Sequence, residues 1–150
     1  MTATMQDTIE RTIVLPVSRD RAWAAVTTPQ QISQWFQHRW EFDLAPGAPI
    51  HFDFGEWGIH RGRVETVEPM DRVVYRWTHG DDADRSIPID QVPSTLMEFR
   101  LENEGDGTRL TVVESGFANL PAELRDDSLR NNTQGWDEQM GNIQKFFETA

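Results

Sequence analysis

The spacing of hydrophobic residues changes period twice along this chain of 150 residues. Near the start, Ile9, Ile13 and Leu15 share one parity, which is the pattern of a half-buried β-strand over residues 8–15. Arg11 falls on the same face of that strand. A charged side chain is costly inside a sheet, so we expect this strand to lie near an edge.

Two short helices are predicted next, because the apolar spacing changes to three and four residues. Ser18 is a favourable N-cap for the first helix, and Thr28 is a favourable N-cap for the second. In the second helix Trp35 and Phe36 share a face with Ile32. That face is expected to cover one end of the core.

Between residues 39 and 115 the apolar period is two, which predicts six further strands. Their expected ranges are 39–44, 49–54, 59–67, 72–78, 95–102 and 108–115. Short turn-like spacers separate most of them, and such spacers favour an antiparallel meander. The exception is residues 80–93, an acidic stretch containing proline that we interpret as a surface loop.

The final segment returns to helical spacing. Its apolar stripe consists of Leu129, Thr133, Trp136, Met140, Ile143 and Phe147. Gly135 and Gly141 lie inside this helix, where glycine lowers helix propensity. We therefore expect these glycines to allow another backbone to approach closely.

Together these elements predict an α+β fold, formed by one domain over residues 1–150. Seven antiparallel strands twist and curl, and the long C-terminal helix must bury its apolar stripe. The economical arrangement is a curled seven-stranded antiparallel sheet wrapped on that helix, with the two short helices after the first strand closing one end. Such a fold leaves an apolar cavity between the helix and the sheet, where ligands tend to bind.

Four stretches of the sequence resemble a known family in the same order along the chain. They are IERTIVLPVSRDRAWAAVTTPQQISQWF, RGRVETVEPMDRVVYRW, GTRLTVVESGF and GWDEQMGNIQKFFE. They are similar to the SRPBCC (START-like, helix-grip) superfamily, and within it to the family named after the activator of heat-shock protein 90 ATPase. The resemblance implies a helix-grip fold and a hydrophobic pocket for small molecules, and it carries no catalytic residue onto this chain.

Composition narrows the possible partners. The formal net charge is -11, with 25 acidic and 14 basic residues, which argues against nucleic acid and against anionic membrane surfaces. The sequence has no cysteine, so disulfides and thiolate chemistry are excluded. It shows no signal peptide and no apolar run long enough to span a bilayer, so we expect a cytoplasmic protein.

Metal and catalytic motifs are weak. The histidines His38, His51, His60 and His79 show no metal-ligand spacing, so we expect no metal and no other cofactor. Glu98 is a candidate acid–base group, but alternation places it on the water-facing side of its strand, opposite the apolar residues next to it. We therefore assign no catalytic residue.

Aromatic and thioether side chains are the best candidates for a ligand pocket. The ligand-binding candidates are Trp35, Phe36, Phe52, Phe54, Trp57, His60, Tyr75, Trp77, Met97, Phe99, Trp136 and Met140. For any one of them, packing in the core is the simpler role. Tyr75 and Trp77 each carry a polar atom that can orient a ligand.

Residues 59–67 carry three basic groups whose directions follow from alternation. We predict His60, Val64 and Thr66 inward, and the two arginines and the glutamate between them outward. Gly62 then allows close approach by the long helix or by a ligand. His60 becomes the titratable group facing the cavity, and Trp57 is expected to guard its rim.

Three functions fit these expectations. The first is binding of a small apolar or aromatic molecule between the sheet and the C-terminal helix, and we expect binding rather than catalysis. The second is an enzyme of the aromatase or cyclase type, which the superfamily contains, with His60 as the acid–base group. The third is an interaction module linked to chaperones and the stress response, with a chaperone or a second copy of the chain as its partner.

Overall fold

The computed structural model describes residues 7–79 and 87–148, without the side chain of Trp57. Its strands are β1 (Thr8–Leu15), β2 (Arg39–Glu41), β3 (Pro49–Asp53), β4 (Ile59–Glu68), β5 (Arg72–Thr78), β6 (Ser94–Glu104) and β7 (Gly107–Ser115). They form one antiparallel sheet in the order β1-β7-β6-β5-β4-β3-β2. All seven predicted strands are confirmed, although β2 ends three residues earlier than expected.

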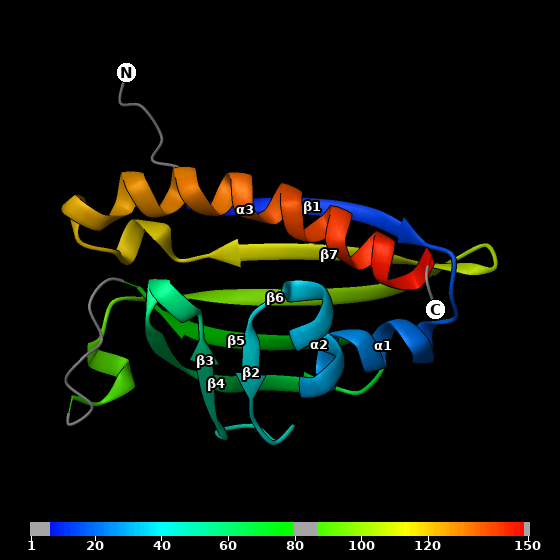
Figure 1. Cartoon of the computed structure of the whole chain (residues 1–150), viewed down its shortest axis with the longest axis horizontal. Helices are drawn as coiled ribbons and strands as arrows, with labels where there is room; N and C mark the ends of the chain where they lie inside the picture. The colour runs from blue at the N-terminus through cyan, green and yellow to red at the C-terminus, as the bar shows by residue number, and fades with distance from the viewer. Residues whose placement is uncertain (1–6, 80–86, 149–150) are drawn as a thin grey trace.

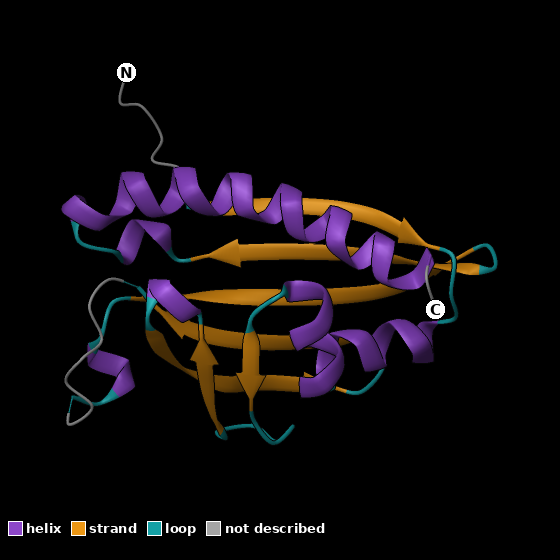
Figure 2. Cartoon of the chain, viewed as in Figure 1, coloured by secondary structure: helices purple, strands orange, loops and turns teal. Residues whose placement is uncertain are grey.

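The helices are α1 (Arg19–Thr27), α2 (Pro29–Phe36) and α3 (Ala122–Glu148). Short 3-10 turns occur at η1 (Gly55–Trp57), η2 (Ile89–Gln91) and η3 (Phe117–Asn119). Figures 1 and 2 show the long helix α3 running beside β1 and β7, with α1 and α2 on the same side of the curled sheet. The predicted helix-grip architecture is therefore confirmed. In the described part of the chain, every helix is too short or too polar to cross a bilayer.

The two predicted helix starts are confirmed, but their capping bonds are not. Ser18 and Thr28 occupy the N-cap positions with extended backbone angles. Neither side chain makes a capping hydrogen bond in the structure. The backbone turn and the packing of α1 and α2 therefore define these starts without side-chain caps.

The position of β1 at a sheet edge agrees with the expectation drawn from Arg11. The Nε–H of Arg11 donates to Oδ1 of Asp137, on α3, at 2.6 Å. The guanidinium of Arg11 lowers the pKa of the Asp137 carboxyl through this bond. An edge strand thus accommodates a charge on its inner face by pairing it with the helix.

A β-bulge in β4 changes which residues face the core. The register of the β4–β5 pair shifts between Val64 and Thr66. Thr66 consequently pairs with Val74, while Val67 pairs with Val73 and packs against the core. The predicted inward orientation of Thr66 is wrong, because a bulge inserts one residue and reverses the alternation after it.

The outer face of the sheet carries ion pairs, as alternation predicts. Arg63 and Arg76 both bond to Glu65, and Arg72 bonds to Glu98. The Glu98 carboxylate also accepts a bond from Arg100. These bonds confirm that Glu98 lies outside the core.

Glycine positions divide into one tight site and two open ones. Gly62 is buried, and a side chain there would overlap the Phe52 ring and the Arg76 carbonyl. Its close neighbours are therefore the adjacent strands rather than the long helix or a ligand. At Gly135 and Gly141 a methyl group would meet nothing within 4 Å, so the expected close approach of another backbone at these helical positions is wrong.

Candidate functional site

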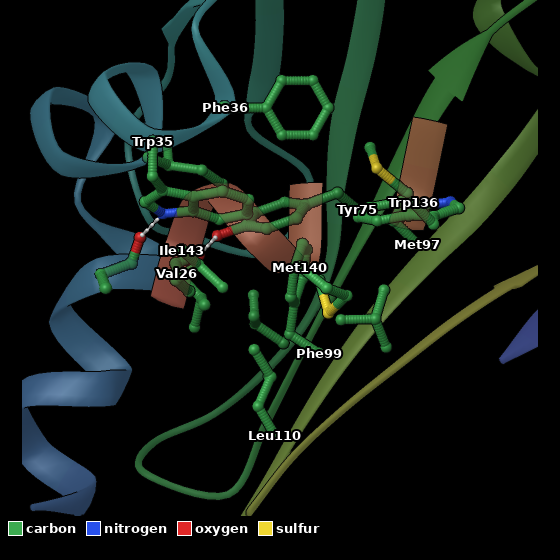
Figure 3. Close-up of a cluster of buried hydrophobic side chains, with 14 of the residues drawn as sticks. Val26, Trp35, Phe36, Tyr75, Met97, Phe99, Leu110, Trp136, Met140 and Ile143 are labelled. Atoms are coloured by element: carbon green, nitrogen blue, oxygen red, sulfur yellow. Dashed lines mark hydrogen bonds between the residues drawn. The ribbon is translucent and has the colours of Figure 1, made fainter. Parts of the chain in front are cut away.

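Most of the predicted pocket residues pack against one another between the sheet and α3. Eight of them are buried: Trp35, Phe36, Phe52, Tyr75, Met97, Phe99, Trp136 and Met140. Figure 3 shows how all of these side chains except Phe52, which it does not label, meet in one cluster. The ring centres of Phe99 and Trp136, for example, are 6.0 Å apart in an edge-to-face arrangement. Such contacts are typical of a close-packed core.

Two polar atoms in this cluster are bonded to the end of α1. The Trp35 indole N–H donates to the carbonyl of Ala25 at 2.8 Å, and the Tyr75 hydroxyl donates to the carbonyl of Val26 at 2.6 Å (Figure 3). Burial raises the pKa of the Tyr75 phenol far above its ordinary value. Tyr75 therefore fixes α1 to β5 with a hydroxyl that stays protonated.

The remaining described candidates, Phe54, His60 and Trp77, line an open cleft at one end of the sheet. The cleft has a volume of about 400 Å³. Its other lining residues are Thr78, His79, Ser128, Asn131 and Asn132. One wall thus comes from β4, β5 and the residues that directly follow β3 and β5, and the other comes from the N-terminal half of α3. The side chain of Trp57 lies outside the described residues.

His60 is half-buried at the edge of this cleft. Its ring centre lies 5.4 Å from that of Phe54, and its Nδ1 is 3.4 Å from the Thr78 hydroxyl. The inward direction predicted for His60 is confirmed, since the bulge of β4 comes after it. His60 contributes one of the polar groups of this wall, beside the aromatic rings of Phe54 and Trp77.

Beneath the cleft lies Glu114, a carboxylate that is completely buried on the inner face of β7. The indole N–H of Trp77 donates to its Oε2 at 2.8 Å, and the indole N–H of Trp136 donates to its Oε1 at 2.8 Å. The Thr95 hydroxyl also donates to Oε2, at 2.5 Å, and the Asn132 amide donates to both oxygens at 3.0 and 3.1 Å. Both oxygens are therefore saturated with donors from β5, β6 and α3.

His79 connects this buried carboxylate to the cleft. Its Nε2 lies 2.7 Å from the Thr95 hydroxyl and 3.5 Å from Oε2 of Glu114. Its Nδ1 lies 3.3 Å from the Ser128 hydroxyl. The His79 side chain is 9% exposed, so it separates the buried carboxylate from solvent.

The chemistry of this arrangement follows from the cost of burying charge. A carboxylate without water needs hydrogen bonds and a counter-charge to remain ionised. Four neutral donors supply the hydrogen bonds, and His79 is the group within ion-pairing distance in the described structure. A buried acid, a bridging hydroxyl and an imidazole at the surface of a cleft can hold a polar ligand group and exchange a proton with it.

Glu114 and His79 were not predicted as site residues, although a signal for Glu114 exists in the sequence. In the strand Gly107–Ser115 the inward positions alternate as Thr108, Leu110, Val112 and Glu114. A glutamate that continues an apolar face is an anomaly, and such anomalies are often functional. His79 gives no such signal, because its neighbours come from β6, β7 and α3.

A second surface hollow and a metal site are the alternatives to this cleft, and among the described residues neither has the side chains that the cleft combines. A larger hollow of about 620 Å³ at the ends of β1 and α3 has no aromatic residue in its described lining. Within residues 7–79 and 87–148, no group of three or more His, Asp or Glu side chains is placed to hold a metal ion. The cleft over Glu114 is therefore the candidate functional site.

A curled seven-stranded sheet closed by a long C-terminal helix, with two short helices after β1, defines a helix-grip protein. The family described as "Activator of Hsp90 ATPase homolog 1-like protein" matches residues 16–148, and the chain belongs to this family. None of the curated proteins matches the sequence significantly.

Several solved structures share the fold. DynU16, from the dynemicin biosynthetic locus, has a TM-score of 0.76 and 26% identity, over 97% of this chain and 48% of DynU16. The chain thus spans about half the length of DynU16. CalU16 from Micromonospora echinospora has a TM-score of 0.70 and 22% identity, over 93% of this chain and 75% of its own. The Aha1 dimer from Colwellia psychrerythraea has a TM-score of 0.70 and 20% identity, over 95% of this chain and 97% of the Colwellia chain.

Proposed function

We propose that this protein binds a small aromatic or apolar molecule in the cleft over Glu114. The ligand body lies against the rings of Phe54 and Trp77, and its polar end faces His60 and His79. The observation that carries the proposal is the buried Glu114 network directly under an open cleft with an aromatic wall. Sites for small molecules usually combine an apolar wall with a few fixed polar groups.

The location differs from the interior cavity that the sequence suggests. Aromatic rings and methionine side chains occupy the space between the sheet centre and α3. A ligand at the end of that interface leaves the buried side chains where they are, because the cleft already has about 400 Å³ of open space. Residues such as Phe52 and Trp136 then support the ligand-contacting residues from behind.

The relatives are consistent with a small-molecule role. DynU16 is described as belonging to a biosynthetic locus, and its structure aligns with nearly all of this chain. This chain spans about half the length of DynU16, so the comparison supports the proposal through the shared fold alone. An enzyme of the cyclase type, with His60 as its acid–base group, would use the same cleft.

The direct test fills the cleft from its exposed side. Asn131 is exposed on α3 and lines the cleft, so Asn131→Trp should block entry without disturbing the core. Its control is Arg130→Trp, at an exposed neighbouring position outside the cleft lining. Binding of a panel of aromatic compounds is measured by tryptophan fluorescence and by thermal shift.

We expect Asn131→Trp to weaken binding at least about tenfold, a loss of ~1.4 kcal/mol, while Arg130→Trp binds like the wild type. Native mass spectrometry of freshly purified protein should also show a co-purified ligand in the wild type and in Arg130→Trp, and none in Asn131→Trp. The proposal is wrong if wild type and Asn131→Trp bind the same compounds equally well, or if no aromatic compound binds at all.

A second candidate function is a protein-interaction role, with an Hsp90 chaperone or with another copy of this chain. It is favoured by the family description and by the dimer described for the Colwellia protein. Sedimentation of the purified chain tests for a dimer, and the ATPase rate of an Hsp90 with and without the chain tests for activation. Asn131→Trp should leave both measurements unchanged, because this role does not depend on the cleft.

A further inference from the structure

We propose that His79 is the proton acceptor of the cleft, and that the ligand carries an acidic hydroxyl group on a conjugated ring. The inference rests on the proposed function, since it requires a ligand seated against Trp77. It adds a chemical role for His79 and a substrate class, the acidic phenols and enols.

The hydrogen bonds fix which nitrogen of His79 carries the proton. A threonine hydroxyl has one hydrogen, and Thr95 donates it to Glu114. The Trp77 indole N–H can only donate, and it reaches the same hydroxyl at 2.8 Å. The 2.7 Å contact between Thr95 and His79 Nε2 must then be an N–H donation from the histidine. In the neutral ring the lone pair is therefore on Nδ1, the nitrogen that faces Ser128.

Glu114 is placed to stabilise the charge that forms when Nδ1 takes a proton. Its Oε2 lies 3.5 Å from Nε2 of His79, and both groups are shielded from water. An attractive pair of charges is worth far more in such a place than in solvent. A base oriented by a buried acid is the arrangement that enzymes use to hold a histidine in one tautomer. Here Thr95 is the positioning residue between the acid and the base.

The position of Nδ1 leaves room for a ligand hydroxyl. The bond between Nδ1 and the Ser128 hydroxyl is 3.3 Å long, at the weak limit for a hydrogen bond, so a ligand can replace it at little cost. Of the described cleft residues, His60 and His79 carry imidazole rings, and the Glu114 carboxyl lies beneath them. The wall formed by α3 contributes Ser128, Asn131 and Asn132, whose side chains carry no acidic or basic group.

The step balances without a further reactant. The ligand O–H bond breaks, its electron pair stays on the ligand oxygen, and the proton binds the lone pair of His79 Nδ1. An ordinary phenol, with a pKa of about 10, is too weak an acid for this transfer near neutral pH. The structure therefore points to a hydroxyl made acidic by an electron-withdrawing ring.

The experiment uses 4-nitrophenol and its methyl ether, 4-nitroanisole, as probes. Both quench tryptophan fluorescence, so quenching that is lost in Asn131→Trp reports their binding in the cleft, and only 4-nitrophenol can lose a proton. The absorbance of bound 4-nitrophenol gives its ionised fraction, at a pH where the free probe is mostly protonated and at saturating protein. We expect the wild type to shift the bound probe towards the phenolate.

Three variants separate proton transfer from binding. His79→Gln keeps hydrogen-bonding atoms but has no basic nitrogen, and should lower the ionisation constant of the bound probe about tenfold or more. Thr95→Val should lower this ionisation constant by a smaller factor, and its affinity for 4-nitroanisole, measured alongside, separates a change in binding from a change in proton transfer. His51→Gln, on the exposed outer face of β3, is the control and should match the wild type.

The outcomes distinguish the two proposals. If neither probe binds, the proposed function fails. If both bind equally and bound 4-nitrophenol stays protonated, the cleft binds aromatic molecules but His79 is not its proton acceptor. A phenolate signal that persists in His79→Gln also overturns the inference. Circular dichroism and a melting temperature near that of the wild type show that each variant is folded.

Discussion

The indole N–H of Trp136, on α3, donates to the buried carboxylate of Glu114, on β7, at 2.8 Å. This bond ties the long helix to the inner face of the sheet with a polar contact inside an apolar interface. The same carboxylate accepts a bond from Trp77, on β5. Glu114 therefore has a structural role as well as its place beneath the cleft.

We expect Glu114→Ala to destabilise the fold by about 3–5 kcal/mol, because it leaves buried donors without partners. Glu114→Gln should cost about 1–3 kcal/mol, since an amide N–H₂ must face an indole N–H or the Asn132 amide. Urea unfolding gives the free energy of unfolding of each variant, and its difference from the wild type is the expected cost. Glu102→Gln, on an exposed carboxylate, is the control and should change the free energy of unfolding by less than about 0.5 kcal/mol. A Glu114→Ala variant as stable as this control would contradict the expected role.

Tyr75 is the only tyrosine of the chain, which makes its hydroxyl easy to follow. Tyr75→Phe removes the bond to the Val26 carbonyl and should cost about 0.5–1.5 kcal/mol at neutral pH. Burial raises the folded pKa of this phenol, so the unfolded chain loses the proton first as pH rises. The stability gained from the protonated phenol is complete below about pH 10 and declines above it.

The measurement is the free energy of unfolding of wild type and Tyr75→Phe at neutral and alkaline pH. The difference between the two proteins should shrink, and can reverse, above about pH 10. When the wild type is titrated to alkaline pH, the ultraviolet absorbance of tyrosinate should appear only as the protein unfolds. Tyrosinate that forms in the folded protein at the ordinary phenol pKa would show that the hydroxyl is not held by α1.

Two glycines allow a matched pair of substitutions. Gly62→Ala should destabilise the protein by about 1–3 kcal/mol, because its methyl group overlaps the Phe52 ring and the Arg76 carbonyl. Gly141→Ala, in the open middle of α3, should stabilise it by about 0.5–1 kcal/mol, because alanine is the better helix former. Melting temperatures of the two variants should therefore move in opposite directions. A gain in stability at Gly62 would show that β4 can shift away from β3 and β5.

The fold was predictable because each of its elements has a local signal. The alternation along β1 and β5 and the stripe that contains Trp136 and Met140 follow from burial of one face, and both strands lie in the one antiparallel sheet that packs on α3. The error at Thr66 has a different cause. A β-bulge depends on the fit between two strands, and the residues of β4 alone do not predict it.

The candidate site was less accessible from the sequence, for physical reasons that differ among its residues. His60 was predictable, since it precedes the bulge and alternation gives its direction. Glu114 has a readable signal, an acid on an apolar face, but its donors come from three separate elements. His79 acquires its role only when the end of β5 meets Thr95 and Ser128. Phe36, Phe99 and Trp136 are buried in the core, whereas Phe54 and Trp77 reach the open cleft, and this difference depends on three-dimensional packing.

His38 gives a last prediction, which links stability at mildly acid pH to the wall of the cleft. Its ring centre lies 5.1 Å from that of Phe54, a cleft residue, and 6.2 Å from that of Phe36. Burial lowers the pKa of the His38 imidazole, and the nearby Asp53 carboxylate partly opposes that shift. The unfolded chain therefore binds a proton more readily than the folded protein, so this contribution is complete above about pH 6.5 and is lost as pH falls through the folded pKa.

In His38→Gln the neutral contact surface is largely kept but the titration is removed. We expect wild type to lose more stability than His38→Gln between about pH 7 and about pH 5, as measured by urea unfolding at each pH. Because the affected ring packs on Phe54, aromatic probes should also bind the wild type more weakly at the lower pH, and the variant should show a smaller change. Equal pH dependence of unfolding in the two proteins would mean that the His38 imidazole is protonated as easily in the folded state as in the unfolded chain.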